Sequence, residues 1–406
     1  MTTEKFIRNK TALVTLIAAC LVVLISLGVR QTFGMFFMDF KNDLGISLTE
    51  SGLSIGLQML MWGLTGPIFG TIADKYGGHK AIALAFLFFI AGIYFLYAGP
   101  NTGIFFQIDM GILVGIGLGG TAISIPMAIV GKHFPLSNRT IAMSLVTAFG
   151  SFGYFLSPLF TAYSLNENGW KITLIAFMIA LIIGLIISYF VRSPSVNESI
   201  EEPNSQGTYD ALKEAFGTKS YILLVSGFFV CGFHITLVGT HVPTYVIDRG
   251  LESWTAAAIL SLIGLFNIFG SLLSGYLSTK ISKKIILSVI YSLRGLSIIL
   301  FIFLPATNIN AFIFGASFGF LWLSTVPATS GIVAHMFGTK YLGMLYGIVF
   351  LSHQIGSFFG SFLGGLFHDI YGSYDYAWYL AIALSIFAAI IHAPIKEEPV
   401  LRLKTE

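Results

Sequence analysis

Twelve long apolar segments, separated by short polar loops, make up most of the 406-residue sequence. A helix needs about 20 consecutive apolar residues to cross the hydrocarbon core of a bilayer, and each segment is near or above that length. Only 10% of the residues are charged, against about 25% in a soluble domain. We therefore expect an all-α membrane protein whose transmembrane helices lie near residues 11–38, 51–71, 80–98, 104–130, 139–162, 170–191, 221–245, 254–278, 285–304, 309–335, 341–366 and 376–394.

The distribution of Lys and Arg predicts the orientation of these helices. With the N-terminus inside, the cytoplasmic segments hold seventeen of the 22 Lys and Arg residues, and the outer segments hold Lys41, Lys171 and Arg249. The remaining two, Arg30 and Arg294, lie within helices. Cytoplasmic loops carry the excess of positive charge in membrane proteins, so both termini are expected to be cytoplasmic. The first segment is too long for a signal peptide and is interpreted as a retained helix, and the short loops favour the inner or plasma membrane of a prokaryote.

The chain is organised as two similar halves joined by a polar segment. Residues 193–219 are rich in Pro, Ser, Asn and Glu, and we expect a cytoplasmic linker in which "TYDALKEAF" forms an amphipathic helix on the membrane surface. The segment "GTIADKYGGHKAI" (70–82) is matched by "GYLSTKISKKIIL" (275–287), and "FGSFGYF" is matched 203 residues later by "SHQIGSF". Internal duplication is common in transporters. The predicted units are a six-helix bundle (1–192), the linker (193–219) and a second six-helix bundle (220–406).

The loop after the second helix carries a recognisable signature. It reads Gly70, three residues, Asp74, two residues, Gly77, then basic residues, and in this respect the chain resembles the major facilitator superfamily. The stretches "GVRQTFGMFF", "FLWLSTVPATSGIVAHMFG" and "LYGIVFLSHQIGSFFGSFLGG" are similar to the monocarboxylate transporter and oxalate:formate antiporter branch. The resemblance implies secondary active transport of a small organic anion by alternating access. The expected protein is a monomer in the lipid bilayer without a cofactor, coupled to protons, to sodium or to a counter-anion.

The eighth helix departs from this resemblance. Monocarboxylate carriers place an arginine in helix 8, often four residues after an Asp or Asn. Here Asn267 stands where the acid or amide is expected, and Ser271 stands where the arginine is expected. The anion-binding element of the resembled family is therefore half missing.

Arg30 is the strongest candidate for binding an anion. It lies in the outer third of the first helix, where a guanidinium costs roughly 2.5–3.5 kcal/mol on insertion scales, and it can hold a carboxylate through two hydrogen bonds. Gln31 is its neighbour and an amide candidate. The alternative is that Arg30 extends toward the membrane surface or caps a helix. We hypothesise that Arg30 supplies the anion recognition that relatives draw from the opposite half.

Other polar side chains in the apolar segments are candidates for the substrate pathway. A histidine can donate a hydrogen bond, carry a charge or carry a proton. The alternative for each histidine is a bond to a backbone carbonyl between packed helices. Tyr and Trp bring a polar group to an apolar ring, although packing remains the alternative for them. The candidates for substrate contact, besides Arg30 and Gln31, are Tyr154, His234, Asn267, Trp322, His353 and Gln354.

A second group of residues is considered for coupling or gating. By resemblance, Asp74 in the second loop helps to latch the two halves together. Asp109 is the carboxylate that lies well inside an apolar segment, where it could carry a proton or pair with an arginine. For Arg294, pairing within the bundle is at least as plausible as substrate contact. The candidates for coupling or gating are Asp74, Asp109, Arg139, His241 and Arg294.

Three classes of function follow from these patterns. The first is a carrier of a small carboxylate, and the alternative is a proton-coupled efflux carrier for drugs or neutral metabolites. A membrane enzyme or receptor is disfavoured, because the sequence contains no recognisable nucleophile–base pair or soluble domain. Cys20 and Cys231 lie in apolar segments and are expected to pack in the core, no metal site is expected because the histidines lack a suitably spaced third ligand, and the net charge of +3 gives no indication of nucleic-acid binding.

Overall fold

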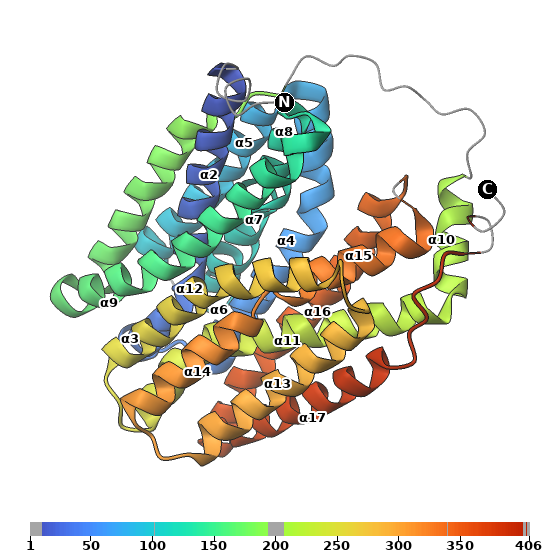
Figure 1. The fold of residues 1–406 in the computed structure, drawn as a ribbon. Helices are drawn as coiled ribbons and strands as arrows, with labels where there is room; N and C mark the ends of the chain where they lie inside the picture. The colour runs from blue at the N-terminus through green and yellow to red at the C-terminus, as the bar shows by residue number, and fades with distance from the viewer. Residues whose placement is uncertain (1–9, 101, 194–206, 339, 401–402, 404–406) are drawn as a thin grey trace.

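The computed structural model describes residues 10–100, 102–193, 207–338, 340–400 and 403, and within these ranges the regular structure is helical throughout (Figure 1). In the first half the helices are α2 (Lys10–Gln31), η1 (Phe33–Phe36), α3 (Phe37–Leu44), α4 (Leu48–Tyr76), α5 (Gly78–Ala98), α6 (Gly103–Phe106), the π-helix η2 (Gln107–Leu113), α7 (Val114–Thr121), α8 (Ser124–His133) and α9 (Leu136–Ser188). In the second half they are α11 (Lys219–Asp248), α12 (Ser253–Leu277), α13 (Lys283–Phe303), α14 (Asn308–Leu321), α15 (Thr325–Phe337), α16 (Leu342–Tyr371) and α17 (Asp375–His392).

The helices make twelve passes, as the sequence predicts. Eleven spans of the described chain are long and apolar enough to cross a membrane, and one of them, 138–188 in α9, has 51 residues. A straight helix of that length would measure roughly 75 Å, more than twice the about 30 Å of a hydrocarbon core. The chain turns back at Gly169, whose φ of 76° is readily adopted by glycine. The turn divides α9 into the expected fifth and sixth helices.

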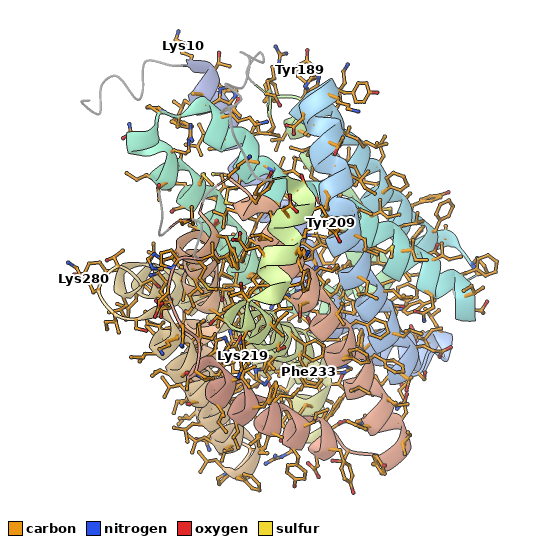
Figure 2. All side chains as sticks on the ribbon, turned by 90° about the vertical axis from the view of Figure 1, so that its right-hand side faces the viewer. Lys10, Tyr189, Tyr209, Lys219, Phe233 and Lys280 are labelled. Atoms are coloured by element: carbon orange, nitrogen blue, oxygen red, sulfur yellow. The ribbon has the colours of Figure 1, made fainter. Side chains whose placement is uncertain are left out.

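Two bundles pack against each other, one formed by α2 to α9 and the other by α11 to α17. We call the face that carries Lys10, Ser193 and Ile395 the inner face, and the opposite face the outer face. Most of the predicted linker, 194–206, lies outside the described residues. Its end forms the expected short helix α10 (Thr208–Gly217), which buries Ala211 and Ala215 and exposes Tyr209 (Figure 2).

The bundles touch along their outer parts and separate toward the inner face. Across the interface, α4 packs on α16, α9 on α12, and η1 on α11. Toward the inner face, Leu64 and Ile68 of α4 are 51% and 56% exposed, and a β-carbon at Gly343 or Gly347 of α16 would meet no heavy atom within 4 Å. Figure 1 shows the same divergence toward α8 and α15. The structure is therefore closed at the outer face and open at the inner face.

Three helices that the sequence predicts as continuous are interrupted. The first breaks at Thr32, the fourth at 122–123 and the tenth at 322–324. In the fourth and tenth, Pro126 and Pro327 each lie at the third position of the helix that follows the break. Proline is tolerated in the first turn, where its missing N–H has no intrahelical partner. The segments expected near 11–38, 104–130 and 309–335 are therefore present as membrane spans, each with a local interruption that the sequence analysis did not predict.

Candidate functional site

Arg30 lies in the last turn of α2, next to the break, and only 7% of it is exposed. Its Nη2 donates to the sulfur of Met59 at 3.2 Å, and its Nη1 donates to Oε1 of Gln31 at 3.4 Å. The phenol of Tyr154 faces the same guanidinium, while the buried Nε has no hydrogen-bond partner among the described residues. No acidic side chain of the described chain forms an ion pair with it. The guanidinium is therefore buried among neutral groups, and at least one of its N–H donors forms no hydrogen bond within the described residues.

Gln31 connects the guanidinium to the second bundle. A β-carbon at Gly239 of α11 would lie 3.6 Å from the ring of Trp322 and 3.8 Å from the amide of Gln31. The Nε2 of Gln31 is buried and has no hydrogen-bond partner among the described residues. A second unused donor thus lies close to Arg30.

Gln354 and His353 reach the same region from α16. The Nε2 of Gln354 donates to the carbonyl of Met59 at 3.0 Å, which links the two bundles directly beside Arg30. The Oε1 of Gln354 lies 3.1 Å from Nδ1 of His353. The His353 ring stacks on Phe350, with centroids 5.6 Å apart. The predicted candidates of helices 1 and 11 are therefore brought together through Met59.

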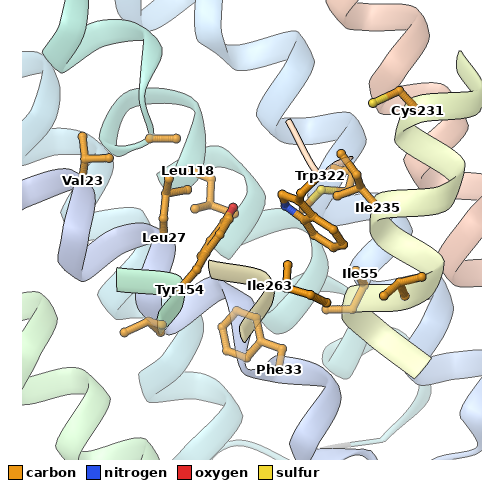
Figure 3. Packing of buried hydrophobic residues seen from close by; sticks show 14 of the residues in the cluster. Val23, Leu27, Phe33, Ile55, Leu118, Tyr154, Cys231, Ile235, Ile263 and Trp322 are labelled. Carbon is orange, nitrogen blue, oxygen red and sulfur yellow. The ribbon is translucent and has the colours of Figure 1, made fainter. Parts of the chain in front are cut away.

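Tyr154 and Trp322 complete the site from opposite bundles. Figure 3 shows the two side chains lying near each other, with Ile263 and Phe33 close by. Both side chains are buried, since Tyr154 is 6% exposed and Trp322 is 1% exposed. Such rings offer an apolar surface and one polar group each.

Asn267 joins the two bundles rather than projecting a free amide. Its Nδ2 donates to Oγ of Ser151 in α9 at 2.8 Å. Its Oδ1 accepts from Oγ of Ser271 at 3.1 Å and from the N–H of Leu323 at 3.0 Å. In this conformation Asn267 holds the interrupted tenth helix and the bundle interface.

Arg294 has a structural environment quite unlike that of Arg30. It is completely buried in α13, and its guanidinium donates to the carbonyls of Leu321 and Trp322 at the end of α14. The rings of Tyr291 and Phe318 lie 5.4 and 5.9 Å from its charge. A helix end inside a membrane leaves carbonyls that need donors. Arg294 caps the broken helix, which agrees with the expected pairing within the bundle.

His234 and His241 form their hydrogen bonds within their own bundle, and the ring of His241 also meets Phe37 of the first bundle, with centroids 5.7 Å apart. The Nε2 of His234 lies 2.8 Å from the carbonyl of Ala381 in α17. The Nε2 of His241 lies 2.6 Å from the carbonyl of Ser361, and its Nδ1 lies 3.2 Å from the hydroxyl of Tyr374. Each histidine thus bonds to a backbone carbonyl between packed helices, which was the alternative considered for it. The structure does not bring either of them to Arg30.

The remaining candidates lie away from the site. Asp74 forms an ion pair with Lys132 at 2.6 Å on the inner face, and both side chains are at least half exposed. Arg139 donates to the carbonyl of Phe134 at 3.4 Å. Asp109 is 5% exposed in the π-helix, and its Oδ2 lies near Gly99 at the outer end of α5. The arginine pairing considered for Asp109 does not occur within the described residues.

Two contributors were not anticipated from the sequence. Met59 places both its sulfur and its carbonyl at the site, and Ser151 accepts the bond from Asn267. No pattern distinguishes Met59 among the 11 methionines, because a carbonyl contact is independent of the residue type. Ser151 could have been found, since it is the repeat partner of Gln354 and a polar residue in a helix of the cavity.

Comparison with known proteins gives one family match and several relatives. A family model described as Major Facilitator Superfamily matches residues 19–326. The uncharacterised MFS-type transporter YcxA of Bacillus subtilis is 25% identical over 92% of this chain and 91% of its own. Monocarboxylate transporter 13 of Rattus norvegicus is 24% identical over 87% of this chain and 82% of its own. The riboflavin transporter MCH5 of Saccharomyces cerevisiae is 24% identical over 82% of this chain and 67% of its own.

A solved structure shares the fold. A bacterial homologue of the human lysosomal transporter Spinster, in an inward-facing and unoccupied conformation, superposes with a TM-score of 0.73. It is 14% identical and covers 95% of this chain and 96% of that chain. At this identity the likeness extends to the arrangement of helices and not to the residues of the site.

Proposed function

Because the chain belongs to the Major Facilitator Superfamily and is a membrane transporter rather than an enzyme, we propose that its cargo is a small organic anion. The anion is a monocarboxylate or a dicarboxylate, and it binds in the space between the two bundles. The bundles then rock about this site and expose it to either face in turn.

The observation that carries the proposal is the state of Arg30. A guanidinium is always charged and presents five N–H donors in a planar fork. Here it contacts a sulfur, an amide and a phenol, and no carboxylate of the described chain pairs with it. A carboxylate that enters from the inner opening would supply both the missing charge and a two-oxygen acceptor.

The second half offers neutral groups for the same ligand. Gln354 and Trp322 lie beside Gln31 and Met59, so a ligand held by Arg30 would touch both bundles. Ser271 is hydrogen-bonded to Asn267 and carries no charge. Since Arg294 is occupied by carbonyls of the tenth helix, Arg30 supplies the positive charge of the site in this proposal.

The proposal includes an orientation. The inner face is the cytoplasmic face, both termini are cytoplasmic, and the protein is a monomer in the cell membrane. The excess of Lys and Arg in the inner segments supports this assignment. Protons or a counter-anion are the proposed coupling partners.

A counterflow screen in proteoliposomes tests the proposed cargo. Each small organic acid is compared with its neutral amide, for example lactate with lactamide, at two pH values. We expect exchange of at least one acid, no exchange of its amide, and loss of exchange in Arg30→Ala. Transport of amides and acids alike, or of cationic compounds in place of acids, would contradict the proposal.

Proton-coupled efflux of a neutral metabolite is the second candidate. It is supported by Asp109, a buried carboxylate for which no hydrogen bond or ion pair is seen among the described residues. Asp109→Asn should then uncouple transport from a pH gradient. If its transport has the same pH dependence as that of the unmodified carrier, Asp109 has no part in coupling.

A further inference from the structure

The outer ends of α4 and α16 are joined by one carboxylate. Oδ2 of Asp369, in the last turn of α16, accepts from the backbone N–H of Thr49 at 2.7 Å and from the Thr49 hydroxyl at 2.6 Å. Thr49 is the second residue of α4, and the two helices belong to different bundles. The bonds therefore cross the interface that must open if the outer face is to be exposed.

Helix electrostatics favour the Asp369 carboxylate at the N-terminus of α4 and disfavour it at the C-terminus of α16. The first N–H groups of a helix lack intrahelical acceptors, and the N-terminus carries a partial positive charge. In α4 the N-cap Ser47 and Glu50 already form a capping box, and Asp369 satisfies the neighbouring N–H of Thr49. Asp369 itself lies at the negative end of its own helix, where an acid is disfavoured. Its position is favourable only while α4 stays in place.

Close packing lies directly beneath this contact. A β-carbon at Gly365 would lie 2.1 Å from the carbonyl of Leu48, and one at Gly52 would lie 2.3 Å from the carbonyl of Ser361. The hydroxyl of Ser361 donates to the carbonyl of Gly52 at 2.6 Å. Glycine is needed at these two positions because the backbones touch. The carboxylate thus closes the outer end of a tightly packed helix pair.

The inner ends of the same two helices show the reversed arrangement. Asp74 lies in the last turn of α4, and the first turn of α16 has no side-chain cap from its N-cap residue Tyr341. In this inner-open structure Asp74 is bonded to Lys132 of its own bundle. Each helix therefore carries an acid in its last turn, and among the described residues only Asp369 bonds to the first turn of the other helix.

We infer that Asp369 is the outer latch of the carrier. Its carboxylate on the N-terminus of α4 stabilises the state that is closed at the outer face, and its release accompanies opening at that face. The inference concerns the balance between the two conformations. It is independent of the substrate and of the proposed function.

Spin-label distances measure this balance without a substrate. One label pair replaces the outer residues Asn42 and Tyr371, and another replaces the inner residues Tyr76 and Lys280, all of which are exposed. Double electron–electron resonance is recorded on the full chain in lipid nanodiscs, with and without Asp369→Ala. The matched control is Asp375→Ala, since Asp375 is an exposed acid of the outer face in the same bundle and has no bond to α4.

We expect Asp369→Ala to lengthen the outer distances and shorten the inner distances in part of the population. The ratio of outer-open to inner-open molecules should rise about tenfold, which corresponds to about 1.4 kcal/mol. Thr49→Val, which removes the hydroxyl and keeps the backbone N–H, should give a smaller shift in the same direction. Asp375→Ala should leave both distributions unchanged.

Two results would overturn the inference. One is unchanged distance distributions in both Asp369→Ala and Thr49→Val, and the other is an equal shift in the Asp375→Ala control. If Asp369→Ala does not yield folded protein, the Thr49→Val variant alone decides, and the absence of a shift in it refutes the latch.

Discussion

Arg30→Met should stabilise the empty protein while it abolishes transport. Arg30 is 7% exposed, and its two hydrogen bonds go to the sulfur of Met59 and, at 3.4 Å, to the amide of the adjacent Gln31. A charge in this position is a cost that a bound anion would offset. Arg294→Met is the matched comparison, and it should have the opposite effect on stability.

The magnitude follows from the contacts of each guanidinium. Removal of the Arg30 charge relieves roughly 2.5–3.5 kcal/mol, and the two weak bonds that are lost were worth about 0.5–1 kcal/mol each, so the net gain is about 1.5 kcal/mol. Arg294 instead satisfies the carbonyls of Leu321 and Trp322 and lies near two rings. Leaving those two carbonyls without a donor costs about 1–3 kcal/mol each, toward the upper end because no water replaces the donor in a membrane interior. This cost exceeds the relief of about 2.5–3.5 kcal/mol from removing the Arg294 charge.

Thermal unfolding followed by tryptophan fluorescence measures these changes. The entropy of unfolding for a chain of this length makes about 1.5 kcal/mol equivalent to about 2 °C in Tm. Arg30→Met should therefore melt about 2 °C higher than the unmodified protein, and Arg294→Met should melt lower. A substrate at 100 times its Kd should add about 2.7 kcal/mol to the unmodified protein and nothing to Arg30→Met.

A lower Tm for Arg30→Met would refute this reasoning. It would mean that the guanidinium is already well compensated in the empty protein, so that its state no longer calls for an anionic ligand. An equal ligand-induced shift in both proteins would refute the assignment of Arg30 to the site even if the stability change had the expected sign.

Two further predictions concern the Asn267 bonds at the bundle interface and the Glu397 bonds at the start of α13. Asn267→Leu should lower Tm by a few degrees, because the partly buried N–H of Leu323 loses its acceptor at a cost of about 1–3 kcal/mol. Ser271→Ala, which removes a different bond to Asn267 and keeps the acceptor of Leu323, should lose less, and equal losses in the two variants would contradict the role of the acceptor. Burial alone would raise the pKa of Glu397, but the N–H groups of Lys284 and Lys283, the hydroxyl of Ser282 and the charge of Lys283 outweigh it and lower the pKa overall. The contribution of Glu397 is therefore present above the ordinary glutamate pKa and is lost as pH falls through the lowered value, so hydrogen exchange in residues 393–400 should speed up in acid relative to an unstructured reference. In Glu397→Gln this acid-induced increase should disappear, and its persistence would contradict the assignment.

The sequence predicts the fold well because the bilayer imposes a strict rule. Every pass must satisfy its own backbone, so apolar length alone locates the twelve helices. The breaks in these helices were missed, although Pro126 and Pro327 were a usable signal, since a proline in the first turn indicates a helix start shortly before it. The interruption after Gln31 has no such marker, because Thr32 and the residues that follow are compatible with a helix.

The candidate site was predicted less completely than the fold. Arg30 and Gln354 could be found because each is a costly polar group in an apolar segment. The helical period does not reveal which neighbouring helix a polar side chain will meet, so His234 and His241 could not be assigned to the carbonyls of Ala381 and Ser361 beforehand. Arg294 presented the same sequence signal as Arg30, and only the broken end of α14 distinguishes a cap from a binding group.

The unpaired charge of Arg30 also bears on how the empty carrier behaves. To close the inner face, the bundles must exclude water from the guanidinium, and a buried charge without a partner costs several kcal/mol more than one with a partner. The loaded carrier should therefore convert between its two states faster than the empty carrier, since a carboxylate neutralises the charge before closure. Exchange of labelled substrate against unlabelled substrate should exceed net uptake in the same proteoliposomes by about tenfold or more, a factor that needs only about 1.4 kcal/mol of difference. Equal rates of exchange and net uptake in the unmodified protein would show that the empty site carries no such penalty, and the charge of Arg30 would then have to be compensated within the protein during closure.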